Sequence, residues 1–267
     1  MESTLEFPDL LRLIDERSTA FSAAVASAPR LDAQVPTCPD WTLFDLVRHL
    51  GEGRRKWAAV VAAGPAGAPP PQSAWDAPTA PREREALLEW WAASARQLLD
   101  ALRESGPDRG CWTWWGTSQS PQTAGAAARH QLQEIAVHTY DAQMTAGVPR
   151  PLPDEVALDG VEEFLSTCCA TTSAWPHEPA AVDYHATEGR SWRLALSADG
   201  ARAVRLAGPG TASATAAGEP PAAADASLRG PAGELVLVLY GRIPVDSLKA
   251  GGERRLFDRL LAWDPDE

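Results

Sequence analysis

Length, composition and charge already exclude several classes of protein. The chain has 267 residues, 45% of them apolar and 22% charged, so it can bury a substantial core and does not have the composition of a disordered chain. Its net charge of -12 argues against nucleic acid or an anionic membrane as a partner. The acidic start lacks a signal-peptide core and no apolar run is long enough to span a bilayer, so we expect a cytoplasmic protein.

Four amphipathic helices are predicted in the first half of the chain. Three of them follow from apolar residues that recur at helical spacing, over residues 4–28, 82–105 and 121–146. The other begins after Thr42, which forms a capping-box pattern with Asp45, and ends at Gly64. The Pro-, Ala- and Gly-rich residues 64–81 predict a surface connection. Four such helices indicate a bundle, in which sites are built from side chains on facing helices.

A change of pattern at the Pro-rich residues 147–153 predicts a boundary between domains 1–150 and 151–267. The second domain is expected to have a helix at residues 154–172, antiparallel strands at 181–187, 191–196 and 201–206, and a helix at 253–263. Residues 207–226 are small and irregular, and the apolar run 234–240 is ambiguous between a buried helix and a strand. The overall pattern predicts an α+β protein.

The four cysteines are Cys38, Cys111, Cys168 and Cys169. They show no CxxC spacing, and adjacent Cys168 and Cys169 cannot bridge to each other without strain. Reduced thiols are therefore expected, in keeping with a cytoplasmic protein.

One set of side chains suggests a metal site. Glu134 and His138 are four residues apart on a predicted helix and so share a face, and His49 offers an imidazole from a second helix. Two histidines and a glutamate would leave a metal one open position for chemistry. The alternative is a solvated polar stripe that also contains His130 and Asp141, with His49 a hydrogen-bonded histidine at the margin of its helix. Against that alternative, the stripe has no Lys or Arg.

Three segments, in order along the chain, resemble one known family. Residues 35–51 look like the N-terminal signature of the mycothiol-dependent maleylpyruvate isomerase family, and the Trp-rich residues 111–116, with Gln122, Arg129 and residues 134–142, are similar to its second signature. Residues 229–242 resemble its C-terminal domain. The resemblance implies a DinB-like four-helix bundle followed by a small α/β domain of sterol-carrier-like type.

The resemblance also implies a site. It places a divalent metal, usually zinc, on His49, Glu134 and His138, and it implies mycothiol as the thiol cofactor or co-substrate. An arginine of the C-terminal domain would complete the site, and Arg242 is the candidate. Many relatives have a histidine just before the ligand glutamate, where this chain has Gln133; that position points about 100° away on the helix, so its loss need not touch the metal.

Two further residues are candidates for cofactor binding. Asp141 could bind the cofactor's amine or orient a ligand imidazole, or it could be a plain surface carboxylate. Trp115, in the Trp-rich loop, could wall a substrate pocket, or the loop could be hydrophobic cover for the end of the bundle. His130 could partly compensate for Gln133, with a surface role as the alternative.

Three functions follow as hypotheses. The first is a thiol-dependent cis-trans isomerase of the maleylpyruvate type, and the second is a mycothiol S-transferase acting in detoxification or natural-product biosynthesis. Both would bring a low-molecular-weight thiol to a small-molecule electrophile. The third is a non-catalytic metal-binding or regulatory protein. A small diacid substrate would favour the first, and a bulky apolar electrophile the second.

Overall fold

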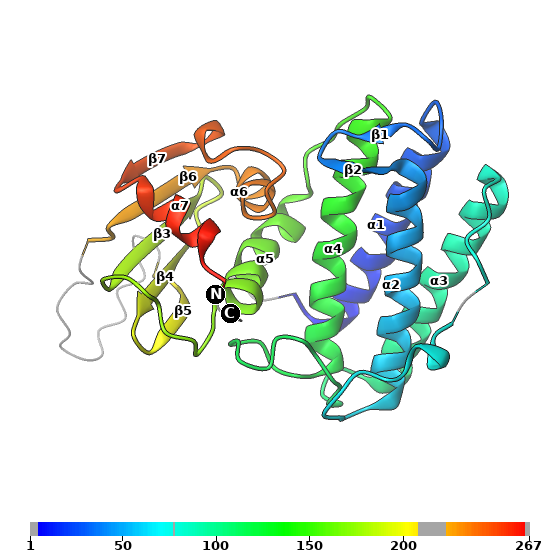
Figure 1. The fold of residues 1–267 in the computed structure, drawn as a ribbon, viewed down its shortest axis with the longest axis horizontal. Coiled ribbons are helices and arrows are strands. Elements are labelled where there is room, and N and C mark those ends of the chain that lie inside the picture. The colour runs from blue at the N-terminus through cyan, green and yellow to red at the C-terminus, as the bar shows by residue number, and fades with distance from the viewer. Residues whose placement is uncertain (1–4, 77, 208–222, 265–267) are drawn as a thin grey trace. The chain divides into compact units, whose positions relative to one another are not determined.

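The computed structural model describes residues 5–76, 78–207 and 223–264, which form two compact units (Figure 1). The first unit comprises residues 1–116 and 121–152, and the second comprises residues 117–120 and 153–267. Long helices build the first unit and a five-stranded sheet with helices builds the second, so the predicted α+β class is confirmed. None of the described helices is both long and apolar enough to cross a membrane.

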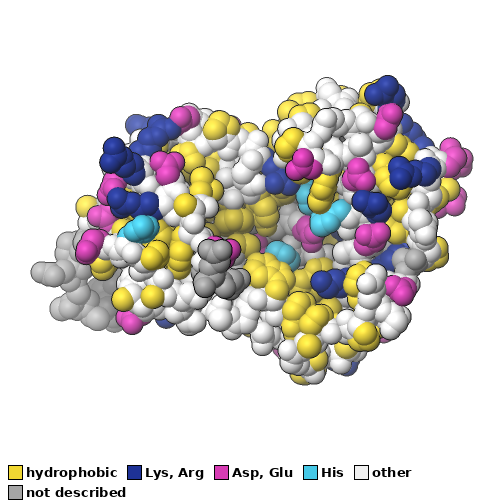
Figure 2. Space-filling model, viewed as in Figure 1, with side chains coloured by type: hydrophobic (Ala, Val, Ile, Leu, Met, Phe, Trp, Pro, Cys, Tyr) yellow, Lys and Arg dark blue, Asp and Glu magenta, His cyan; other side chains and the backbone are white. Residues whose placement is uncertain are grey.

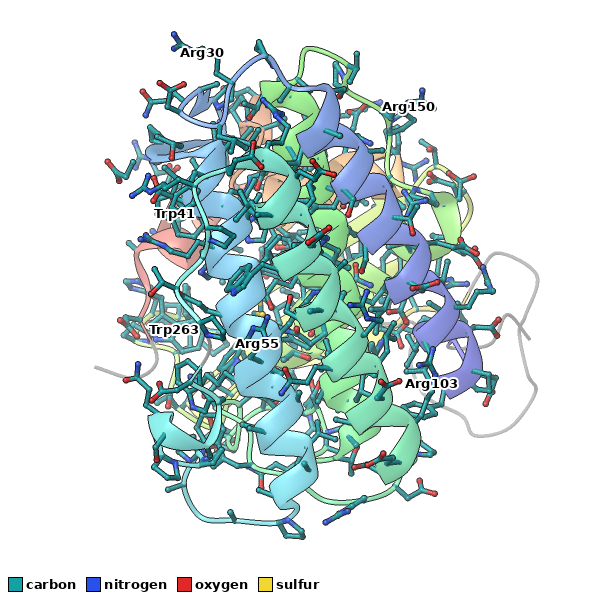
Figure 3. The ribbon with its side chains drawn as sticks, turned by 90° about the vertical axis from the view of Figure 1, so that its right-hand side faces the viewer. Arg30, Trp41, Arg55, Arg103, Arg150 and Trp263 are labelled. Atoms are coloured by element: carbon teal, nitrogen blue, oxygen red, sulfur yellow. The ribbon has the colours of Figure 1, made fainter. Side chains whose placement is uncertain are left out.

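Four long α-helices form the described part of the first unit. They are α1 (Phe7–Ser27), α2 (Leu43–Ala63), α3 (Arg84–Ser105) and α4 (Ala124–Thr145). Figure 3 views them from the side of α3, which α1 and α2 flank, with α4 behind. Helix α1 packs on α3 and α4, and α2 packs on the same two helices, so the four enclose one core. The predicted bundle is confirmed.

Helix α2 begins where the sequence predicts. The Thr42 hydroxyl accepts the backbone N–H of Asp45, and the Asp45 carboxylate accepts the backbone N–H of Thr42, which completes the capping box. Just before it, β1 (Gln34–Val35) and β2 (Cys38–Thr42) pair as a small antiparallel hairpin. The sequence does not predict this hairpin because its strands are short and one of them contains Pro39.

The second unit is a mixed sheet with strand order β5-β4-β3-β6-β7. Its strands are β3 (Ala180–Ala186), β4 (Ser191–Ser197), β5 (Gly200–Arg205), β6 (Ala226–Gly230) and β7 (Lys249–Gly252). The antiparallel β3-β4-β5 meander confirms the three predicted strands. Strand β6 adds in parallel to β3 and was not predicted, nor was the Gly-rich β7. Most of the irregular segment predicted at residues 207–226 lies outside the described residues.

Among the described residues of this unit, three α-helices accompany the sheet, namely α5 (Asp154–Phe164), α6 (Ala232–Leu239) and α7 (Arg255–Ala262). The apolar run that the sequence left ambiguous is the buried helix α6. The helix predicted over residues 154–172 is α5 followed by a π-helical turn, Leu165–Cys169. The turn is wider because the backbone N–H of Ala170 bonds back to the carbonyl of Leu165, at 2.9 Å and five residues away.

Close packing of α2 against α3 predicts opposite effects for two glycines on α2. A Cβ on Gly51 would lie 2.0 Å from the Trp90 ring, whereas a Cβ on Gly53 would have no neighbouring atom within 4 Å. We expect Gly51→Ala to lower the free energy of unfolding by about 1–3 kcal/mol through overpacking. Gly53→Ala should raise it by up to about 1 kcal/mol through helix propensity. Urea unfolding measures both; equal stabilities would contradict the packing described.

Candidate metal centre

The three predicted metal ligands lie together. Glu134 and His138 come from α4 and His49 comes from α2, and one ligand atom of each lies within 4.8 Å of the other two. The Nε2 atom of His49 is 3.4 Å from Oε1 of Glu134. Two ligand atoms bound tetrahedrally to zinc at its usual bond lengths are about 3.4 Å apart. Two imidazoles and a carboxylate are also a ligand set that zinc takes in catalytic sites, so these residues suit a divalent cation in both chemistry and spacing.

The aromatic wall of the centre comes from the hairpin. The Trp41 ring, on β2, has its centroid 4.6 Å from that of His49 and 6.1 Å from that of His138. Figure 3 labels Trp41 at the edge of the bundle beside α2. The two imidazoles meet edge to face, with centroids 5.6 Å apart. Side chains of His49 and Glu134 stay 42% and 23% exposed, so the centre is open to small molecules.

The carboxylate of Glu134 is held in its charged form. Burial would raise its pKa, but a hydrogen bond with His49 and the nearby imidazoles of His130 and His138 outweigh that effect and lower the pKa to about 2. The side-chain amide of Gln131 donates to its second oxygen. An ionised, oriented carboxylate is the form that ligates a metal.

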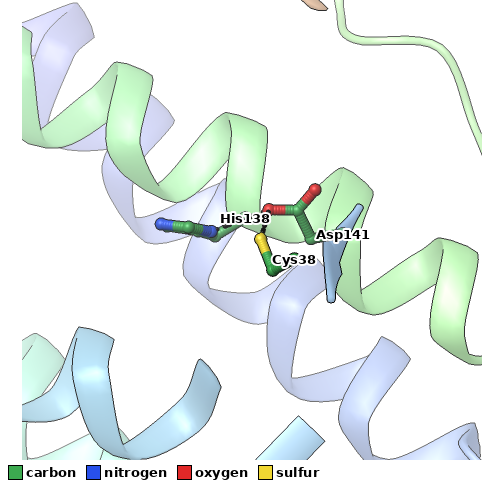
Figure 4. Close-up of side chains that lie close together, drawn as sticks. All are labelled: Cys38, His138 and Asp141. Carbon is green, nitrogen blue, oxygen red and sulfur yellow. Dashed lines mark hydrogen bonds and ion pairs between the residues drawn. The ribbon is translucent and has the colours of Figure 1, made fainter. Parts of the chain in front are cut away.

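The imidazole of His138 is held by a buried carboxylate (Figure 4). Its Nδ1 lies 2.8 Å from Oδ2 of Asp141, which is fully buried. The hydroxyl of Thr37 donates to the other oxygen of Asp141 at 2.6 Å, and Sγ of Cys38 is 3.7 Å from Oδ2. With Nδ1 bonded to Asp141, Nε2 is the nitrogen available to a metal.

These contacts decide between the alternatives for the polar stripe on α4. His138 is 8% exposed and Asp141 is fully buried, so the solvated-stripe interpretation is wrong for both, as is the plain surface role for Asp141. The geometry supports the role of Asp141 in orienting the imidazole. Binding of a cofactor amine by Asp141 stays a prediction.

Cys38 is a neighbour that the sequence reasoning did not place at the centre. Its sulfur, a ring nitrogen of His138 and a carboxylate oxygen of Asp141 form a second group of ligand atoms within 4.8 Å of one another. The two groups share His138, whose Nδ1 already bonds to Asp141. The set with His49 and Glu134 is therefore the one that leaves this hydrogen bond intact.

The Trp-rich loop packs around His130, one turn before Glu134. The His130 ring has its centroid 5.1 Å from Trp115 and 5.6 Å from Trp114. Trp115 is only 2% exposed, stacks on Trp57 and donates its indole N–H to the carbonyl of Pro121. These are the contacts expected of hydrophobic cover. Cofactor binding by Trp115 stays a prediction.

A buried charge in the bundle core was also missed by the sequence reasoning. Arg54, on α2, is 1% exposed, and its guanidinium lies 4.7 Å from the centroid of the Trp91 ring. Burial lowers its pKa to about 10, while the charge of Glu134 acts in the opposite direction. The only signal in the sequence is an arginine inside the apolar stripe of α2. Gln133 is also fully buried.

Arg242 belongs to the second unit, where it follows α6. Its Nη1 donates to the carbonyl of Tyr240 at 2.7 Å, and the residue lines a cavity within that unit. That Arg242 completes the active site stays a prediction.

Fold and site together define a two-domain protein with a His/Glu/His centre in a helical bundle. The profile of the mycothiol maleylpyruvate isomerase N-terminal domain matches residues 11–143, and that of the C-terminal domain of the same family matches residues 155–259. The chain therefore belongs to the mycothiol-dependent maleylpyruvate isomerase family.

Solved structures support the fold. A crystal structure of a mycothiol-dependent maleylpyruvate isomerase, and one of a histidine-to-alanine variant, each align with a TM-score of 0.61 and 14% identity. Each alignment covers 95% of this chain and 97% of the other. A comparison with curated proteins gives no match.

The hydrogen bond between Asp141 and His138 predicts an effect on metal affinity. In Asp141→Asn, the amide cannot supply the same charged acceptor to Nδ1, so we expect zinc to bind about 10–100-fold more weakly. Glu52→Gln, an exposed change on α2, is the control and should leave affinity unchanged. Competition with a chromogenic chelator measures both affinities; equal values for Asp141→Asn and the unaltered chain would refute the positioning role.

Proposed function

We propose that this chain is a metal-dependent enzyme that brings the thiol of mycothiol to an electrophilic small molecule. The observation that carries the proposal is the meeting of His49, Glu134 and His138 from two helices, with ligand atoms within 4.8 Å of one another. Membership of the isomerase family supports mycothiol as the thiol. A divalent cation, with zinc as the first choice, would supply an open position at which a thiol loses its proton.

The chain's own residues prepare this centre. The carboxylate of Asp141 fixes the ring of His138, and the hydrogen bond with His49 helps to hold the pKa of Glu134 low, so that this ligand is ionised. Trp41 covers one side of both imidazoles, which limits the directions from which a thiol and an electrophile can approach.

The first candidate reaction is cis-trans isomerisation of the maleylpyruvate type. The thiolate adds to one carbon of an activated cis double bond, and the electron pair moves to the adjacent electron-withdrawing group. Rotation about the carbon–carbon bond, which is now single, follows, and elimination returns the thiolate with the trans product. Arg242 would pair with a substrate carboxylate, because a guanidinium matches a carboxylate with two parallel hydrogen bonds.

The second candidate is S-transfer, in which the thiol stays joined to the electrophile. Turnover of a bulky apolar electrophile would favour this candidate, and turnover of a small diacid would favour the first. The third hypothesis, a non-catalytic metal-binding or regulatory protein, predicts metal without turnover.

Removing a ligand should remove the metal. We expect His49→Ala and His138→Ala each to lower bound zinc by well over half, because two remaining ligands hold zinc poorly. His177→Ala, an exposed histidine of the second unit, is the control and should keep full stoichiometry. Elemental analysis of the purified proteins checks this. Unchanged zinc in both ligand variants would eliminate the proposed centre.

Activity should need both metal and thiol. With mycothiol and a panel of electrophiles that includes maleylpyruvate, we expect turnover that a chelator abolishes and added zinc restores. In Arg242→Gln, KM for carboxylate-bearing electrophiles should rise by about tenfold, the loss of one charge-assisted pair. KM for neutral electrophiles should not change. Zinc-loaded protein without turnover on the whole panel would favour the non-catalytic hypothesis.

A further inference from the structure

The second unit contains a cavity of about 560 Å³. This volume falls within the roughly 300–1,000 Å³ of pockets that enclose drug-sized molecules. Its walls come from the end of α5 and the π-helical turn, from β3 and β6, and from α6, α7 and the chain that follows α6. Phe164, Leu228, Val238 and Phe257 are among the apolar side chains that line it. A cavity with these walls gains free energy by enclosing an apolar molecule.

Apart from Arg242, the polar side chains on the cavity wall are neutral. Cys168 and Cys169, both from the π-helical turn, line it together with Tyr184 of β3. Burial raises the pKa of all three groups, to about 12 for Cys169, and the charge of Glu163 adds to the effect on the two thiols. Protonated thiols are weak nucleophiles, so an occupant of this cavity would not be attacked by them.

One lining residue carries a charge. Within the described residues, Arg242 is the only lining residue with a charged side chain. The hydrogen bond from its Nη1 to the carbonyl of Tyr240 holds the guanidinium in place, and the Tyr240 ring packs on Phe164 with centroids 4.8 Å apart. The planar guanidinium suits a carboxylate better than any other common organic anion except phosphate.

The cavity reaches the surface beside α7. Leu261 lines the cavity and is also 76% exposed, whereas Phe257, one turn earlier on the same helix, is buried. Trp263, just after α7, lines the cavity too and packs edge to face on Trp175 at 5.0 Å. Figure 2 shows hydrophobic side chains on the surface of the second unit in the region where Figure 1 draws α7. A small molecule could therefore enter past the side chains of this short helix.

We propose that this cavity binds an apolar molecule with a single carboxylate, its apolar body among the side chains of α5, α6 and α7 and its carboxylate on Arg242. This goes beyond the proposed function, because the cavity lies within the second unit and none of its lining residues is a metal ligand.

Binding of unreactive probes tests the proposal. Calorimetric titration of the zinc-loaded full chain compares 4-phenylbutyrate with its neutral counterpart 4-phenyl-1-butanol and with the diacid succinate. We expect 4-phenylbutyrate to bind at least about tenfold more tightly than either. Succinate or 4-phenyl-1-butanol bound as tightly as 4-phenylbutyrate would overturn the proposal.

Two substitutions distinguish the contribution of the probe's carboxylate to binding from that of its apolar body. Arg242→Gln should weaken 4-phenylbutyrate about tenfold and leave the alcohol unchanged. Val245→Trp should fill part of the cavity and weaken both probes, whereas Val204→Trp, an exposed position on β5 away from the cavity, should weaken neither. Equal effects of Arg242→Gln on both probes, or no effect of Val245→Trp in protein with unchanged circular dichroism, would overturn it. The comparison of the three probes in the unaltered chain does not depend on any variant folding.

A metal-free variant keeps this proposal separate from the proposed function. In His138→Ala, 4-phenylbutyrate should bind as in the unaltered chain, because no lining residue of the cavity is a metal ligand. Retained binding together with inactivity of the unaltered chain would contradict the proposed function and leave the cavity assignment standing. If 4-phenylbutyrate does not bind to His138→Ala, the probe binds at the metal rather than in the cavity, and the assignment is overturned.

Discussion

The hydrogen bond between the Nδ1 of His138 and the buried carboxylate of Asp141 is the interaction on which the candidate centre depends. It fixes the ring and leaves Nε2 as the nitrogen available to a metal. Asp141 is itself held by the hydroxyl of Thr37, from a hairpin far from it in the sequence. Burying a carboxylate completely costs free energy unless the carboxylate is hydrogen-bonded. The hairpin, the carboxylate of Asp141 and the imidazole of His138 therefore depend on one another.

The packing of the bundle determines the position of His49, the ligand that comes from α2. His49 can meet Glu134 only if α2 lies close to α4, and α2 is held from its other side by α3. Gly51, two residues after His49, allows this because its missing side chain leaves room for the Trp90 ring. The capping box at Thr42 and Asp45 fixes where α2 begins, and so where His49 falls along it. Stability and metal binding are therefore coupled through the same helix.

The sequence predicted features that depend on local spacing. The long periodic helices, the capping box and the shared face of Glu134 and His138 all follow from neighbours a few residues apart. It did not predict pairings made by distant segments. Strand β6 joins β3 across more than forty residues, and the buried state of Asp141 depends on Thr37, 104 residues away. Spacing alone therefore favoured a solvated stripe on α4, and only the tertiary contacts show that His138 and Asp141 are enclosed.

The central claim is that His49, Glu134 and His138 hold a metal that can take a thiol as a further ligand. Zinc-edge X-ray absorption of the purified chain, before and after addition of mycothiol, tests it most directly. The account predicts nitrogen and oxygen neighbours with imidazole scattering at first, and one added sulfur at about 2.3 Å with mycothiol. A chain that binds no zinc, or a spectrum that does not change when mycothiol is added, would contradict it.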